Sequence, residues 1–92
     1  MKIVRFEDKR VRQTEYNGDL YFSVEDLVAI LTDSVNPKDY IKKMRTRDPE
    51  LSKGWGQIVT TLTMQTAGGP QKVNCANLGG CFRIIQSMFT RY

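Results

Sequence analysis

The stretch Tyr16–Leu27, YNGDLYFSVEDL, contains the two signals from which the fold can be worked out. Asn17-Gly18 is the strongest two-residue hairpin signal, because both positions tolerate a positive φ. Ser23 stands three residues before Asp26, a spacing typical of a helix N-cap whose side chain satisfies a free backbone N–H. The stretch therefore predicts a β-hairpin that leads directly into a helix.

Further strands are predicted on both sides of this stretch. Near the amino terminus the predicted strands cover residues 3–6, 10–16 and 19–22. From Ile58 the apolar residues alternate with polar ones, which is the period of a strand. A turn at 67–70 then sends the chain back through residues 71–76, with Val73 and Cys75 pointing inward. The chain thus has a second predicted hairpin.

Three helices are predicted from apolar residues at helical spacing. They cover residues 24–31, residues from Pro37 to a point before Pro49, and residues from about 78 to 89. Asn36 and Asn77 are placed to cap the second and third helices. The apolar stripe of the last helix consists of Leu78, Cys81, Phe82, Ile85 and Phe89, and the Gly79-Gly80 pair in its first turn indicates close backbone packing.

Residues 50–57 are predicted to be a loop, because two glycines flank the only tryptophan, Trp55. The expected order is therefore β-β-β-α-α-β-β-α. This order predicts an α+β fold in which small antiparallel hairpins pack against about three helices. With 92 residues, the chain has room for one domain, expected to cover residues 1–92.

The net charge of +4 is distributed unevenly along the chain. Residues 17–37 contain acids and no base, whereas residues 54–92 contain bases and no acid. Such asymmetry indicates an anionic partner such as nucleic acid, although a basic surface also serves solubility alone.

The strongest candidate site is a basic cluster on and after the second helix. Lys38, Lys42 and Arg45 follow at i, i+4 and i+7, away from the predicted core stripe. Such a helix can lie along phosphates, or its charges can simply face solvent, with Asp39 paired to Lys43. The full set of expected nucleic-acid-binding residues is Lys38, Lys42, Lys43, Arg45, Arg47, Lys53, Trp55, Gln71, Lys72 and Arg83.

Two features beside this cluster have both a functional and a structural interpretation. Trp55 can stack on a base or fold back onto the core. The Gly68-Gly69-Pro70 tip can enter a DNA groove or can be only a turn. Two successive helices also allow a helix-turn-helix interpretation, although the five-residue connection and the flanking strands are atypical.

The sequence offers no set of residues for catalysis. Histidine is absent, which removes the commonest general base and the commonest zinc ligand. Cys75 and Cys81 fit neither a redox C-x-x-C motif nor a zinc site and are predicted to be reduced, buried thiols. We therefore expect no enzyme, no metal and no cofactor, and a cytoplasmic protein without a membrane partner.

Taken in order, several segments resemble the BRO amino-terminal (Bro-N) domain of prophage antirepressors and of DNA-damage-inducible protein D-like proteins. These segments are Leu20–Leu27, Leu31–Tyr40, Leu51–Ile58, Gly68–Lys72, Asn74–Asn77 and Phe82–Ser87. The resemblance implies a non-catalytic DNA-binding regulatory module, acting on transcription and in the DNA damage response, with duplex DNA as its partner. The alternative is a protein-interaction module that binds a repressor or another regulator, with the loop that carries Trp55 and the shortened last helix as its apolar anchor.

Under this DNA-binding hypothesis, any reading of the DNA sequence is expected from Gln57, Gln65, Gln71, Asn74 or Arg83. Two departures stand against the family pattern. An acidic residue is missing before the glycine that opens the last helix, and the chain ends soon after Gln86-Ser87. The expectation is a domain shortened at its carboxyl terminus, whose uncovered core would favour a homodimer.

Overall fold

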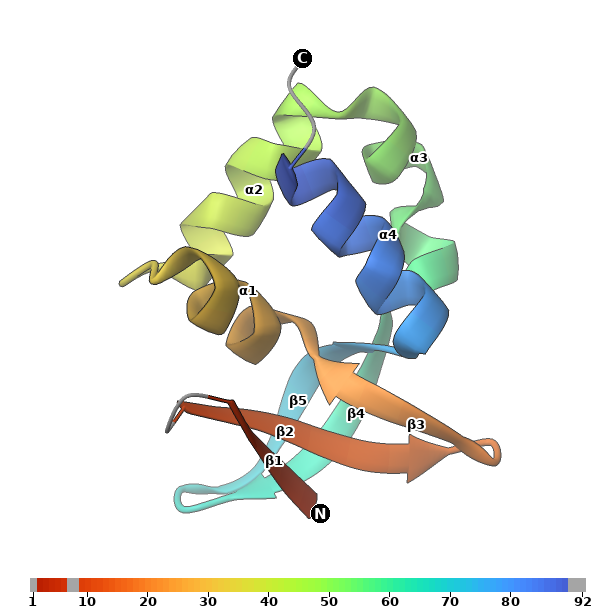
Figure 1. Ribbon diagram of the computed structural model, residues 1–92. Coiled ribbons are helices and arrows are strands. Elements are labelled where there is room, and N and C mark those ends of the chain that lie inside the picture. Colours follow the sequence, from red (N-terminus) through yellow and green to blue (C-terminus); the bar gives the residue numbers. More distant parts are fainter. Residues whose placement is uncertain (1, 7–8, 90–92) are drawn as a thin grey trace.

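The computed structural model describes residues 2–6 and 9–89 and has the predicted α+β architecture (Figure 1). In chain order its elements are β1 (Lys2–Phe6), β2 (Lys9–Tyr16), β3 (Asp19–Ser23), α1 (Val24–Thr32), α2 (Pro37–Arg47), α3 (Pro49–Ile58), β4 (Thr60–Thr66), β5 (Gly69–Ala76) and α4 (Leu78–Phe89). The helices gather on one side of the molecule and the strands on the other.

The strands form one antiparallel sheet with the order β1-β2-β3-β5-β4. Its two halves are joined only where β3 meets β5, through the pairs Phe22–Ala76 and Ser23–Cys75. By contrast, β4 and β5 pair along their whole length, from Thr60–Cys75 to Thr66–Gly69. The sheet therefore consists of a three-stranded half and a hairpin that share a narrow junction below the helices (Figure 1).

The local signals in Tyr16–Leu27 act as predicted. Asn17 and Gly18 both have positive φ, 51° and 77°, as the tight hairpin requires. Ser23 caps α1, and its Oγ accepts a hydrogen bond from the Asp26 backbone N–H at 3.3 Å. The hairpin and the helix start are confirmed.

The prediction of a loop at 50–57 is wrong, because this segment forms most of α3. Asp48 ends α2 and also caps α3, where its Oδ1 accepts a hydrogen bond from the Leu51 backbone N–H at 3.1 Å. Pro49 occupies the first helical turn, where its missing N–H costs nothing. The fold therefore has four helices within the described residues, and the strand predicted from Ile58 begins at Thr60.

Burial explains why α3 forms in spite of its two glycines, each of which lowers helix propensity by roughly 1 kcal/mol. Leu51 is buried and Trp55 packs against the same core. A Cβ at Gly54 or Gly56 would meet nothing within 4 Å, so neither glycine is required for close packing. Tertiary packing has overridden the local propensity.

The main core lies between the helices and the sheet junction. Its buried residues are Val24, Val28, Met44, Leu51, Val59, Ala76, Cys81 and Ile84. A smaller buried cluster of Met64, Val73 and Cys75 lies on the β4–β5 hairpin. Val73 and Cys75 thus point inward, as predicted.

The apolar stripe predicted for the last helix coincides only in part with the face that α4 buries. Cys81 and Ile84 are buried, whereas Leu78, Phe82 and Phe89 are more than half exposed. The face that α4 buries consists of Gly80, Cys81, Ile84 and the polar Ser87, so it is rotated around the helix axis relative to the apolar stripe. Part of the apolar stripe is therefore left uncovered.

Both cysteines are free and buried, as predicted. Desolvation by burial raises the pKa of Cys75 and of Cys81 to about 11. The two thiols therefore stay protonated and poorly nucleophilic near neutral pH. In the part of the chain that the structure describes, no helix is long and apolar enough to cross a membrane.

Candidate functional site

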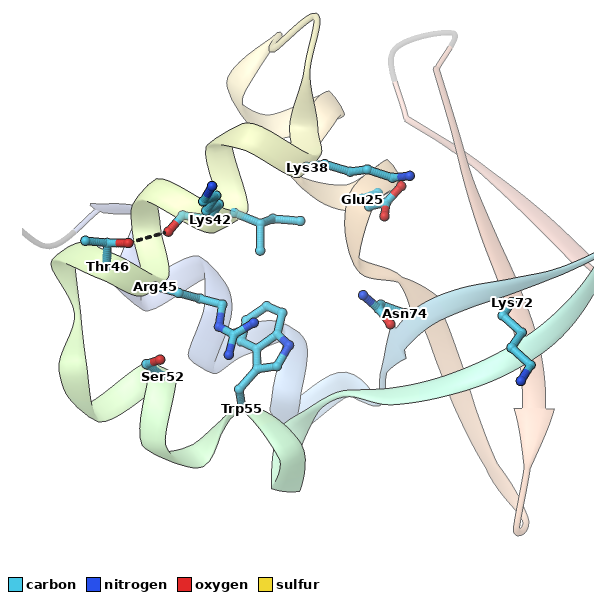
Figure 2. A pocket seen from close by; sticks show the side chains of 10 residues that line it. Glu25, Lys38, Lys42, Arg45, Thr46, Ser52, Trp55, Lys72 and Asn74 are labelled. Carbon is cyan, nitrogen blue, oxygen red and sulfur yellow. Dashed lines mark hydrogen bonds between the residues drawn. The ribbon is translucent and has the colours of Figure 1, made fainter.

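An open basin of about 540 Å³ lies between α2, α3 and β5, with one edge formed by α1 (Figure 2). Five of the predicted site residues line it: Lys38, Lys42, Arg45, Trp55 and Lys72. The other lining residues are Glu25, Ile41, Thr46, Ser52 and Asn74. The basin thus combines four cationic side chains with one carboxylate and one large aromatic ring.

Helix α2 supplies three of the cations because of their spacing. Lys38, Lys42 and Arg45 lie on one side of the helix, while Met44 on another side is 1% exposed and anchors the helix in the core. Asn36 caps the helix by accepting a hydrogen bond from a first-turn backbone N–H at 3.2 Å. The predicted basic stripe and its separate buried face are both present.

Strand β5 contributes the fourth cation through the alternation of its side chains. Lys72 and Asn74 are exposed and line the basin, whereas Val73 and Cys75 between and beyond them are buried. Of the residues expected to read DNA sequence, Asn74 is the one that reaches the basin. Gln71 is exposed on β5 but does not line the basin.

Helix α3 places Trp55 in contact with both the core and the basin. The ring is half-buried and packs against the core cluster, so the structural interpretation holds in part. The guanidinium carbon of Arg45 lies 4.7 Å from the ring centroid, which is a cation–π contact. In the described part of the chain the Arg45 Nε is buried and has no hydrogen-bond partner. Arg45 and Trp55 together form a flat, partly apolar platform.

Two of the remaining predicted cations lie on the surface outside the basin. The Lys43 Nζ is 3.0 Å from the Asp39 carboxylate, in the i,i+4 pair that the sequence suggested as an alternative. Lys53 is exposed on α3 and does not line the basin. An exposed ion pair such as Lys43–Asp39 contributes little to stability and offsets its own charge.

Arg47 and Arg83, which were also predicted to bind nucleic acid, make contacts within the fold. The Arg47 guanidinium donates a hydrogen bond to the Ser87 carbonyl oxygen at 3.1 Å. The Arg83 guanidinium lies 3.4 Å from the carboxylate of Asp48, which is 1% exposed. Both contacts join α4 to the segment between α2 and α3, so these arginines have a structural role in the free protein.

Glu25 is not among the site residues predicted from the sequence. The half-buried Glu25 reaches the basin because α1 runs beside α2 and β5, and no local pattern encodes that arrangement. Asn74 carried a detectable signal, since it shares the exposed face of β5 with Lys72.

The basin is suited to binding a polyanion. Lys38, Lys42, Arg45 and Lys72 make no ion pair within the described residues, and the nearby carboxylate of Glu25 offsets only part of their charge. Among those residues, no group of three or more His, Cys, Asp or Glu side chains is placed to hold a metal ion. The cationic side chains of the basin can contact phosphate groups, and Arg45 and Trp55 can stack on a ring.

A second, apolar groove of about 280 Å³ lies away from the basin. It is lined by Leu27, Ile30 and Leu31 of α1, by Leu78, Cys81, Phe82 and Ile85 of α4, and by Val11 and Phe22 of the sheet. Phe82 and Leu78 are 62% and 58% exposed, so the groove includes the uncovered stripe of α4.

Comparisons with family models, with curated proteins and with solved structures find no match to this chain. The resemblance to the Bro-N domain therefore stays a prediction from the sequence, and the geometry of the basin and of the groove is the basis for the proposals that follow.

Proposed function

We propose that this chain is a non-catalytic DNA-binding regulatory module, of the phage-antirepressor type that its sequence resembles, and that it binds DNA in the basic basin. The observation that carries the proposal is the convergence of four cations from α2 and β5 around Trp55, with no ion-pair partner in the described residues. Because these cations have no ion-pair partner in the described residues, they break no ion pair when they meet a phosphate.

Support also comes from the way the predicted cations divide. Arg47 and Arg83, which have hydrogen-bond or ion-pair partners inside the fold, lie outside the basin, whereas the cations of the basin have no ion-pair partner in the described residues. Lysine and arginine contacts to phosphate position a protein on DNA without reading its sequence. Affinity for DNA should therefore depend strongly on salt.

Replacing Lys42 and Arg45 together with alanine is expected to abolish most of the binding to a labelled DNA duplex. Four phosphate contacts predict a slope of about −3.6 for log affinity against log salt, and the double variant should reduce its magnitude by about 2. Fluorescence anisotropy at several salt concentrations measures both quantities. A second double variant, Lys38→Ala with Lys42→Ala, removes the same amount of charge but keeps the contact between Arg45 and Trp55. It therefore separates the effect of lost charge from the effect of losing that contact.

The matched control is Lys43→Ala with Lys53→Ala, which removes two positive charges from outside the basin. This control should bind with nearly the wild-type slope, because neither residue lines the basin. Absence of duplex binding at low salt would contradict the proposal of DNA binding in the basin. So would equal weakening of binding by the folded Lys42→Ala/Arg45→Ala variant and the folded Lys43→Ala/Lys53→Ala control.

The apolar groove favours a second candidate function, a protein-interaction module that binds a repressor protein. The features that support it lie on the last helix, α4, and not at Trp55, because Phe82 and Leu78 are large apolar residues left exposed beside the groove. Exposed aromatic residues beside such a groove are typical of partner-binding surfaces.

Under this second function, Phe82→Ser is expected to weaken binding to a purified phage repressor at least tenfold while DNA binding stays unchanged. Phe89→Ser is the control, since Phe89 is 73% exposed and does not line the groove. Isothermal titration measures the affinity. Repressor binding that survives Phe82→Ser but is lost in Lys42→Ala/Arg45→Ala would assign the partner to the basin instead.

A further inference from the structure

A carboxylate stands in the wall of the basic basin, where a site built only for phosphate would not place one. Glu25 is half-buried, and within the described residues it makes no hydrogen bond or ion pair, although its charge also acts on the nearby Arg12 guanidinium. A negative charge here repels every phosphate that the neighbouring lysines attract. It is also not needed for the helix dipole alone, because Asp26 lies in the same first turn of α1.

Asn74 reaches the basin near Glu25, and its hydrogen-bonding direction is set. The Thr61 hydroxyl donates to the Asn74 Oδ1 at 3.0 Å, from the directly paired position on β4. The amide oxygen is therefore engaged, and the amide N–H groups are left to donate. Figure 2 shows Glu25 and Asn74 on one side of the basin and Arg45 with Trp55 on the other.

The platform on the opposite side is suited to a flat ring. Bases in single strands stack on aromatic rings and on arginine planes, and the basin contains both, with the Arg45 guanidinium over the Trp55 ring. The volume of about 540 Å³ lies within the roughly 300–1,000 Å³ typical of pockets that enclose one small ligand. One base with its sugar fits inside that space, whereas a duplex can only lie across its opening.

We propose that the basin seats one unpaired base and that Glu25 and Asn74 select bases that carry, on their Watson–Crick edge, an exocyclic amino group beside a ring acceptor, namely cytosine and adenine. Glu25 accepts a hydrogen bond from the amino group, and the Asn74 amide donates to the adjacent ring nitrogen. Thymine presents a carbonyl oxygen where the amino group would lie, and the Glu25 carboxylate repels it. This selectivity rests on the proposed function of DNA binding in the basin.

The test compares single-stranded hexamers of deoxycytidine, deoxyadenosine and thymidine, which carry the same number of phosphates. Cytosine and adenine hexamers should bind roughly tenfold more tightly than the thymine hexamer. Trp55 is the only tryptophan, so quenching of its fluorescence reports a base in the basin directly. Cytosine and thymine are of similar size, so a difference between them reports the amino group rather than stacking.

Glu25→Ala should bind the thymine hexamer more tightly than the wild type does and should lose the preference for cytosine. Glu50→Ala removes an exposed acid of α3 outside the basin and should keep the preference. Equal binding of cytosine and thymine hexamers by the wild-type protein, with duplex binding intact, overturns the base selectivity alone. Absence of binding to every hexamer and to duplex DNA at low salt overturns the proposed function as well.

Discussion

Replacing Asp48 with alanine is expected to lower the free energy of unfolding by about 3 kcal/mol, a large fraction of the total for a small domain. The carboxylate is 1% exposed and has three described partners on two helices. It accepts hydrogen bonds from the Leu51 backbone N–H at 3.1 Å and the Ser87 hydroxyl at 2.8 Å, and it pairs with Arg83 at 3.4 Å. With alanine at position 48, the buried Ser87 hydroxyl loses its hydrogen-bond acceptor, and α3 loses its N-cap.

The matched control is Asp39→Ala, which removes the same charge from an exposed ion pair with Lys43. Its expected cost is below about 0.5 kcal/mol, because exposed pairs contribute little. Urea denaturation followed by circular dichroism measures both variants, and the loss in Asp48→Ala corresponds to a melting temperature lower by about 15 °C. A loss for Asp48→Ala no greater than that for Asp39→Ala would contradict the role assigned to this carboxylate.

Asp48 also illustrates which parts of the structure could be predicted from the sequence. The hairpin at Asn17-Gly18 and the caps at Ser23 and Asn36 involve residues two or three positions apart, so the local sequence specifies them. The contacts of Asp48 with Arg83 and Ser87 join residues 35 and 39 positions apart. A sequence pattern gives the propensity of each segment but not the partner that tertiary folding brings to it.

The same distinction applies to the candidate site. The basic stripe of Lys38, Lys42 and Arg45 follows from helical spacing, so it could be predicted and is present. The sequence could not separate these cations from Arg47 and Arg83, because only the packing of α4 shows which arginines are engaged. Glycine content predicted a loop around Trp55, and burial against the core made that segment a helix instead.

Two adjacent glycines at the start of α4 are expected to respond to alanine in opposite directions. A Cβ on Gly80 would lie 2.7 Å from the Ile58 backbone oxygen and 3.0 Å from the Ala76 Cβ, so the backbone itself would have to move. A Cβ on Gly79 would meet only the Asn77 Oδ1, at an ordinary 3.7 Å. Gly80→Ala should therefore cost about 2 kcal/mol, and Gly79→Ala should stabilise by up to about 1 kcal/mol.

The Gly80 contact also connects the stability of the fold with the candidate site. Ile58 ends α3 three residues after Trp55, so displacing its carbonyl moves the end of the helix that carries the platform. Gly80→Ala is thus expected to shift the Trp55 fluorescence and to weaken DNA binding, whereas Gly79→Ala leaves both unchanged. Denaturant titration and tryptophan emission measure the pair together. Equal stability of the two variants would show that α4 does not depend on close approach at Gly80.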